Sequence, residues 1–228
     1  MNDRPPFDVA AIYREGRERL LALAPTLSED QLATVTPTCP EWTVQDIYAH
    51  LTGLAVEVIG GRVERRGSPG RTAVQVGSRR GMTITEICAE WRGIGDAMDD
   101  VIASGGRAMT PLGIDIWTHE QDIANGAGVE SGRDGAGLYL TMSAAWSIKA
   151  KLRTAEIAPL RIVAGRADWT IGDGDAAATL RMTEYEMARA VLGRRSVDQL
   201  RAYDWDGDSE PYLQHLPVFN PPEYDIVE

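Results

Sequence analysis

Apolar residues recur at intervals of three and four through the first two thirds of the chain, which is the spacing of one face of an α-helix. Between residues 8 and 23, for example, Ile12 and Leu20 lie on an apolar face with charged residues between them. Thr43 followed by Asp46 has the spacing of a capping box and predicts the start of another helix. On these grounds we expect helices over residues 8–23, 28–33, 43–60, 83–103, 109–124 and 138–157.

The segments between these helices and the last third of the chain have a different pattern. Residues 36–42 read as an irregular, proline-stiffened segment, and the middle of residues 61–81 reads as a loop rich in glycine and arginine. After Pro159, alternating apolar positions predict short strands, followed by a helix and an irregular acidic tail from Asp204. The strands are expected at residues 160–164, 169–175 and 178–182, and the helix at 183–192.

These elements predict an α+β protein with two domains. Residues 1–157 would form an up-down helical bundle, and residues 158–228 a small α+β domain with an irregular tail.

Composition narrows the class of protein. The net charge of −11 argues against nucleic acid as a partner, because phosphate binding needs a clustered basic surface. No run approaches the ~20 apolar residues of a membrane helix, and the N-terminus lacks a signal pattern. Cys39 and Cys88, the two cysteines, cannot make a disulfide framework. We therefore expect a cytoplasmic protein.

Two of the three histidines lie in settings that suggest chemistry. His50 falls on the apolar stripe of its helix, where it is either a core histidine bonded to the backbone or a metal ligand. Asp115 and His119 are four residues apart and share a helix face. They are either a surface pair or, with His50, three ligands of one ion that leave an open position. Asp122 would orient the His119 ring, unless it is a solvent-facing acid.

Two further residues have weaker claims. Cys39 is a conceivable thiolate ligand or nucleophile, although a small buried thiol is the simpler interpretation. His215 is expected to be a residue of the tail.

The sequence around these residues resembles a known family. Residues 39–51, CPEWTVQDIYAHL, resemble the CPGWTVRDxxAHL signature of the mycothiol-dependent maleylpyruvate isomerase family, which belongs to the DinB-like metal-binding helical bundles. Residues 115–123, DIWTHEQDI, are similar to the family's acid-x-x-x-His-x-x-Asp segment, and residues 184–195 to the closing helix of its sterol-carrier-like α+β domain.

The resemblance implies a divalent metal, usually zinc, held by His50, Asp115 and His119, and mycothiol as a cosubstrate. The isomerase itself has glutamate where Asp115 stands. Because aspartate is one methylene shorter, this departure weakens the case for isomerase activity more than the case for a metal.

Three functions are compatible with these observations. The leading hypothesis is a metal-dependent transferase or isomerase that uses a low-molecular-weight thiol of the mycothiol type on a small electrophile. The second is a non-catalytic regulatory module that binds a metal or small ligand. The third is a metal-dependent hydrolase. An arginine would receive an anionic substrate, but the sequence does not choose among Arg79, Arg80 and Arg107. The electrophile, the thiol, the metal and the oligomeric state stay open.

Overall fold

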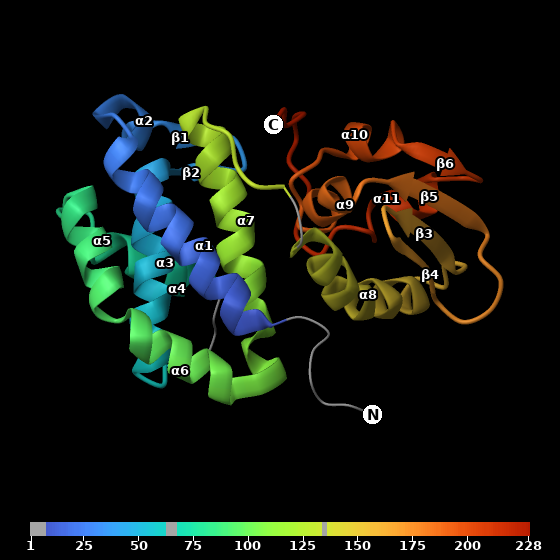
Figure 1. The fold of residues 1–228 in the computed structure, drawn as a ribbon. Coiled ribbons are helices and arrows are strands. Elements are labelled where there is room, and N and C mark those ends of the chain that lie inside the picture. The colour runs from blue at the N-terminus through green and yellow to red at the C-terminus, as the bar shows by residue number, and fades with distance from the viewer. Residues whose placement is uncertain (1–7, 63–67, 134–135) are drawn as a thin grey trace. The chain divides into compact units, whose positions relative to one another are not determined.

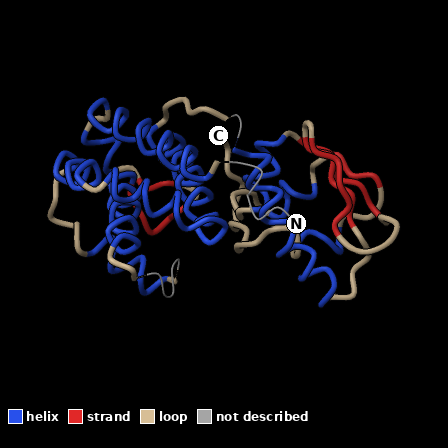
Figure 2. The backbone as a smooth tube through the Cα atoms, turned by 60° about the horizontal axis from the view of Figure 1, so that its bottom comes forward, coloured by secondary structure: helices blue, strands red, loops and turns tan. Residues whose placement is uncertain are grey.

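The structure, a computed structural model, describes residues 8–62, 68–133 and 136–228 (Figure 1). The chain divides into two compact units, residues 1–131 and residues 132–228. The first is built mainly of helices, and the strands of the second gather into one sheet (Figure 2). This confirms the predicted α+β class with a helical N-terminal part.

Helices α3 and α7 form the centre of the first unit. Helix α3 packs against α4, α5, α6 and α7, and α1 packs against α6 and α7. The bounds are α1 Val9–Leu23, α2 Glu29–Ala33, β1 Val35–Thr36, β2 Cys39–Thr43, α3 Val44–Ile59, α4 Pro69–Gly77, α5 Ile84–Gly93, α6 Gly95–Gly105 and α7 Thr110–Ala127, with 3₁₀ turns at Ala24–Thr26 and Gly106–Met109.

The start of α3 is fixed as its sequence predicts. The Thr43 side chain accepts a hydrogen bond from the Asp46 amide, and the Asp46 carboxylate accepts one from the Thr43 amide. This reciprocal capping satisfies two amide groups that the first turn of a helix leaves without partners. The helix then places a mostly buried face, including Ile47, His50 and Leu54, inside the unit.

Three expectations for the first unit are wrong. Residues 61–81 contain helix α4, which packs its buried Gln75 and Val76 against α3. The expected helix 83–103 is two helices, α5 and α6, which break at Ile94 between two glycines. Residues 36–42 take part in an antiparallel pair of strands, β1 and β2. In each case tertiary packing or pairing outweighs weak local propensity.

The second unit is a sheet covered by helices. Its strands run in the order β4-β3-β5-β6, with β3 parallel to β5 and antiparallel to β4, and β6 antiparallel to β5. The bounds are α8 Ala136–Thr154, β3 Leu160–Ala164, β4 Ala167–Ile171, β5 Ala178–Met182, α9 Glu184–Val191, α10 Val197–Arg201, β6 Asp204–Asp206 and α11 Glu210–Leu213.

Helix α8 belongs to the second unit. Its Ile148 and Leu152 are buried in one core with Ile162 and Leu180 of the sheet. The chain therefore divides between residues 131 and 132, earlier than the boundary at 157/158 that the helical pattern suggested. A helical period shows that a helix buries a face, but not which partner covers it.

The acidic tail is also more ordered than expected. Beyond Asp204 the chain forms β6, which extends the sheet, and α11, whose Tyr212 and Leu213 are buried in the core. Among the residues that the structure describes, no helix combines the length and the apolar character needed to cross a bilayer.

Candidate metal centre

Helices α3 and α7 bring together the three residues that the sequence proposed as ligands. His50 on α3 and His119 on α7 are both buried, with 3% and 7% exposure, and Asp115 lies one turn before His119. The Asp115 carboxylate lies between the two rings. Its Oδ2 is 3.5 Å from His50 Nε2, and its Oδ1 is 3.6 Å from His119 Nε2.

The far nitrogen of each imidazole has its own partner. His119 Nδ1 is 3.1 Å from Asp122 Oδ2, the contact that the i,i+3 spacing suggested, and Asp122 is fully buried. His50 Nδ1 is 2.8 Å from the side-chain oxygen of Gln75 on α4. The sequence reasoning missed Gln75, because it took residues 61–81 for a loop. Val74 and Val76 beside it were too weak a signal to predict the helix.

An aromatic ring lies against the two imidazoles. The Trp42 ring centroid is 5.0 Å from that of His50 and 6.0 Å from that of His119, and the two imidazoles meet edge to face at 5.0 Å. Trp42 comes from β2, so the strand pair that the sequence did not predict supplies one wall of the site. This wall lowers the local dielectric and strengthens electrostatic interactions inside.

The environment of His50 favours positive charge at the site. Burial alone would lower the pKa of His50, but the Asp115 carboxylate, together with hydrogen bonds to Asp115 and Gln75, raises it above its ordinary value. Asp115 and Gln75 thus stabilise positive charge on the His50 ring.

The arrangement fits a divalent metal. Ligand atoms about 2.0–2.1 Å from a tetrahedral zinc lie about 3.3–3.4 Å apart, close to the 3.5 and 3.6 Å separations found here. One donor atom from each of His50, Asp115 and His119 lies within 4.8 Å of the others. Asp122 can only accept a hydrogen bond as a carboxylate, so it holds the proton of neutral His119 on Nδ1 and leaves the Nε2 lone pair toward Asp115. A lone pair and a carboxylate that face each other in this way leave a position that a cation can occupy.

Comparisons with known proteins assign the helical unit to a family. Residues 13–124, which include all three candidate ligands, match the family described as "Mycothiol maleylpyruvate isomerase N-terminal domain". The N-terminal unit therefore belongs to that family. The matched residues begin in α1 and end in α7, so the family domain corresponds to the helical unit.

Solved structures of this family are similar in fold. One is the crystal structure of the mycothiol-dependent maleylpyruvate isomerase, with a TM-score of 0.59 and 11% identity, covering 82% of this chain and 88% of that chain. Another is a histidine-to-alanine mutant of the same isomerase, with a TM-score of 0.55, the same identity and the same coverage. This similarity concerns the fold. No curated protein matches the chain.

A second group of candidate donors shares His119 with the group formed by His50, Asp115 and His119. Cys39 on β2, His119 and Asp122 also offer donor atoms within 4.8 Å of one another, and the Cys39 sulfur is 3.7 Å from Asp122 Oδ2. Cys39 is only partly buried. The remaining histidine, His215, lies just after α11 in the second unit.

The candidate arginines are placed as follows. Arg79 is buried and paired with Glu90 at 2.7 Å, so its charge is already matched. Arg80 lies on the surface beyond α4, and the side chain of Arg107 lies outside the described residues.

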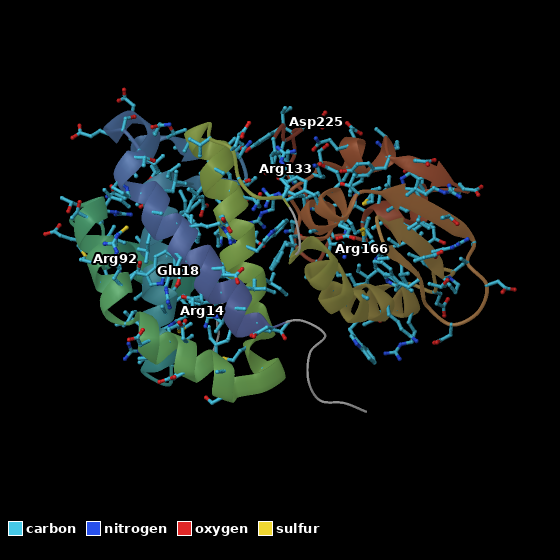
Figure 3. The ribbon with its side chains drawn as sticks, in the orientation of Figure 1. Arg14, Glu18, Arg92, Arg133, Arg166 and Asp225 are labelled. Carbon is cyan, nitrogen blue, oxygen red and sulfur yellow. The ribbon has the colours of Figure 1, made fainter. Side chains whose placement is uncertain are left out.

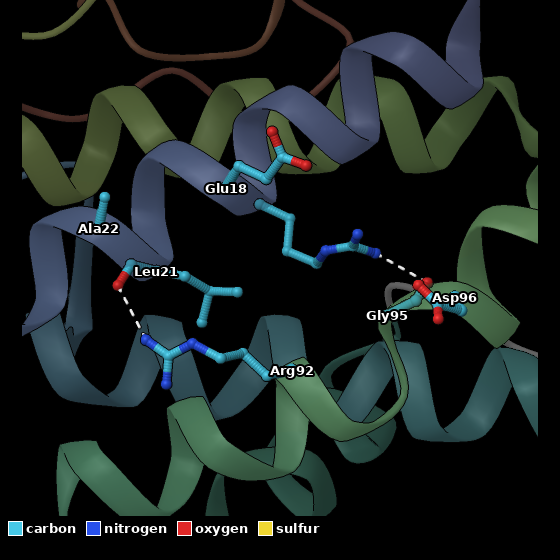
Figure 4. A pocket seen from close by; sticks show the side chains of 7 residues that line it. Glu18, Leu21, Ala22, Arg92, Gly95 and Asp96 are labelled. Carbon is cyan, nitrogen blue, oxygen red and sulfur yellow. Dashed lines mark hydrogen bonds between the residues drawn. The ribbon is translucent and has the colours of Figure 1, made fainter.

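The pocket of about 410 Å³ between α1, α5 and α6 does not include the candidate ligands (Figure 4). Its two arginines are engaged by main-chain oxygens, Arg17 by Gly95 at 2.9 Å and Arg92 by Leu21 at 3.2 Å. The candidate ligands therefore lie apart from this pocket, on α3 and α7.

Proposed function

We propose that the chain is a metal-dependent enzyme that uses a low-molecular-weight thiol of the mycothiol type to isomerise a small electrophilic substrate or to transfer the thiol to it. The observation that carries this proposal is the convergence of two buried histidines on one carboxylate at 3.5 and 3.6 Å. Membership of the mycothiol maleylpyruvate isomerase family supports the thiol and the isomerase reading. The proposal implies the reducing cytoplasm, where such thiols stay reduced.

The chain's own residues have distinct roles in this proposal. His50, Asp115 and His119 hold the ion, which we expect to be zinc. Asp122 orients the His119 ring through Nδ1, and Trp42 limits the access of water to the rings.

The metal would supply a thiolate near neutral pH. A free thiol has a pKa of about 8.5, and a bound divalent cation favours the charged sulfur. The thiolate would add to one carbon of an activated C=C bond, whose electron pair would move onto the conjugated carbonyl. In an isomerisation that pair would return to re-form the C=C bond after rotation and expel the thiolate, whereas in a transfer the neighbouring carbon would take up a proton and the C–S bond would remain. Half-buried Asp115 and fully buried Asp122 already bring negative charge to the site, which favours a cation over an anionic ligand in direct contact with them.

Metal content tests the first part of the proposal. Tag-free wild-type protein, His50→Ala and His119→Ala are incubated with zinc, desalted and measured by plasma mass spectrometry. We expect about one equivalent in the wild type and none in either variant. His215→Ala is the matched control, because it removes the only other histidine, and it should retain the metal. A wild type that stays metal-free, or stoichiometric zinc in His119→Ala, would refute the metal site.

Turnover tests the second part. The zinc-loaded protein is assayed on a panel of small unsaturated and activated electrophiles, with and without mycothiol. Product formation that requires both metal and thiol supports the proposal. Turnover without thiol would identify a hydrolase that uses bound water instead. Tight metal binding with no turnover across the panel would favour a regulatory binding module.

A further inference from the structure

We infer that Glu57 and Gln75 are positioning residues that set the tautomer of His50, so that its Nε2 lone pair faces the metal position. The inference rests on the proposed function for the identity of the ion, but it concerns side chains that no sequence motif singled out. It is carried by an unbroken chain of contacts from Arg71 through Glu57 and Gln75 to His50.

The direction of these hydrogen bonds starts at Glu57. Its Oε1 pairs with the Arg71 guanidinium, which keeps the buried side chain a carboxylate. Its Oε2 is 2.6 Å from Gln75 Nε2. A carboxylate accepts hydrogen bonds and cannot donate them, so the amide nitrogen of Gln75 must face Glu57.

The orientation of Gln75 then decides the tautomer of His50. With its nitrogen on Glu57, the amide presents its oxygen to His50 Nδ1 at 2.8 Å. The oxygen accepts, so Nδ1 carries the proton of the neutral ring. The other nitrogen, Nε2, is left with its lone pair 3.5 Å from the Asp115 carboxylate. Neutral His50 is therefore prepared to bind a cation at Nε2 before any cation arrives.

Packing holds this relay in place. Gln75 is 2% exposed and Glu57 is 7% exposed, so water competes little for their hydrogen bonds. The relay also depends on the close approach of α4 to α3 at Gly53. A Cβ at Gly53 would lie 2.7 Å from the Gln75 Cβ, which is shorter than normal contact. The glycine thus lets the glutamine sit directly against the helix that carries His50 and Glu57.

The two histidines reach the same state by different routes. His119 Nδ1 contacts the Asp122 carboxylate directly. His50 Nδ1 instead contacts the neutral amide of Gln75, which is itself oriented by the Glu57 carboxylate. A carboxylate in direct contact with His50 Nδ1 would add further negative charge at the site. The amide transmits the preference for one tautomer without that charge.

Glu57→Gln is the decisive variant. Its new carbonyl oxygen should still accept from Arg71, which turns its new NH₂ toward Gln75. The Gln75 amide then reverses and donates to His50 Nδ1, which moves the ring proton to Nε2. Side-chain ¹⁵N NMR of the metal-free protein, at a pH where the ring is neutral, reads the tautomer. We expect Nδ1–H in the wild type and Nε2–H in Glu57→Gln.

Zinc affinity gives the second readout. Competition with a chromophoric chelator should show roughly 10–100-fold weaker binding for Glu57→Gln and Gln75→Leu than for the wild type. Gln45→Leu is the matched control, because Gln45 is a glutamine on α3 whose amide bonds to the Met82 carbonyl instead. It should bind zinc as the wild type does. Circular dichroism checks that each variant is folded.

The outcomes separate this inference from the proposed function. A wild-type Nε2–H tautomer, or wild-type tautomer and affinity in folded Glu57→Gln, would overturn the relay even if the protein binds zinc. A wild type that binds no metal would refute the proposed function. In that case the NMR comparison still decides whether Glu57 and Gln75 set the His50 tautomer.

Discussion

Both units bury charged side chains, but they do so in different ways. In the second unit, Arg195 lies 2.8 Å from Glu186 and 2.9 Å from Glu228, and Arg189 also pairs with Glu228. In the first, the nearest atoms of Asp115 and the two histidines are 3.5 and 3.6 Å apart. The cluster of the second unit has both signs of charge at hydrogen-bond distance. In the first unit, the two imidazoles and the Asp115 carboxylate surround a position that suits a cation.

The difference separates a structural cluster from a candidate site. Arginine and glutamate in direct contact satisfy each other. Arg133, which is labelled in Figure 3, adds a cation–π contact with the Tyr185 ring, whose centroid is 4.8 Å from the guanidinium carbon. Such a cluster is complete without a ligand. The two imidazoles differ from this cluster, because Asp122 and Gln75 fix their outer nitrogens while their inner nitrogens face the Asp115 carboxylate at 3.5 and 3.6 Å, a spacing that suits a shared cation.

The largest effect is expected in the second unit. Arg195→Met should destabilise it by about 3–5 kcal/mol, because the substitution removes the guanidinium that pairs with Glu186 and one of the two that pair with buried Glu228. Hydrogen exchange of the β3 and β5 amides measures this loss. The control is Arg161→Met, which breaks the exposed pair with Asp168 and should have little effect. Equal losses in the two variants would contradict the structural role of the cluster.

The first unit should instead respond to metal. Zinc at 100 times its dissociation constant should stabilise this unit by about 2.7 kcal/mol, since it binds the folded state only. Hydrogen exchange in α3 and α7 should slow, while exchange in the sheet of the second unit stays unchanged. Asp115→Asn should abolish the gain, because it removes the anionic ligand. Zinc protection in the second unit alone would place the metal elsewhere.

Acid should weaken the second unit through Glu186. Burial would raise the pKa of Glu186, but hydrogen bonds from Arg195 and Tyr203 and the charge of Arg195 lower it below its usual 4.5. A depressed folded-state pKa gives stability that is present above the unfolded-state pKa and is lost as the pH falls through the folded-state value.

We therefore expect the free energy of unfolding of the second unit to fall as the pH drops below about 4.5, and Glu186→Gln to flatten this dependence. Denaturant titrations from pH 6 to about pH 3 measure it. The control is Glu156→Gln, an exposed acid of the same unit. An unchanged slope in Glu186→Gln would show that other groups control acid unfolding.

The sequence predicted the candidate metal ligands and few of the residues that contact and orient them. Spacing alone placed Asp115, His119 and Asp122 on one face, because helical periodicity fixes which residues are neighbours. Gln75 and Trp42 were not assigned to the site, because their contacts depend on how α4 and β2 pack against α3. Such contacts join residues distant in sequence and leave no local pattern.

The same limit applies to the fold. Helices with strong caps, such as α3 after Thr43, were predicted to within a residue. The break at Ile94 depends on the two glycines around it and on Arg17, which reaches the Gly95 carbonyl at 2.9 Å. The assignment of α8 to the second unit depends on which core covers its apolar face. Neither is visible in a period of 3.6 residues.

The smallest effect is expected for Cys39→Ala, and this variant distinguishes the two donor groups that share His119. Asp122 already accepts from His119 Nδ1, and the Cys39 sulfur is farther from it, at 3.7 Å. If the metal lies between His50, Asp115 and His119, removing the sulfur should leave zinc stoichiometry unchanged and alter affinity by no more than about threefold.

Cys88→Ala is the control, since Cys88 is the other cysteine and is buried on α5. Loss of zinc in Cys39→Ala but not in Cys88→Ala would move the metal to Cys39, His119 and Asp122. His50 would then be a core histidine, and the cation site that contrasts with the ion-pair cluster of the second unit would include the Cys39 thiol instead of His50 and Asp115.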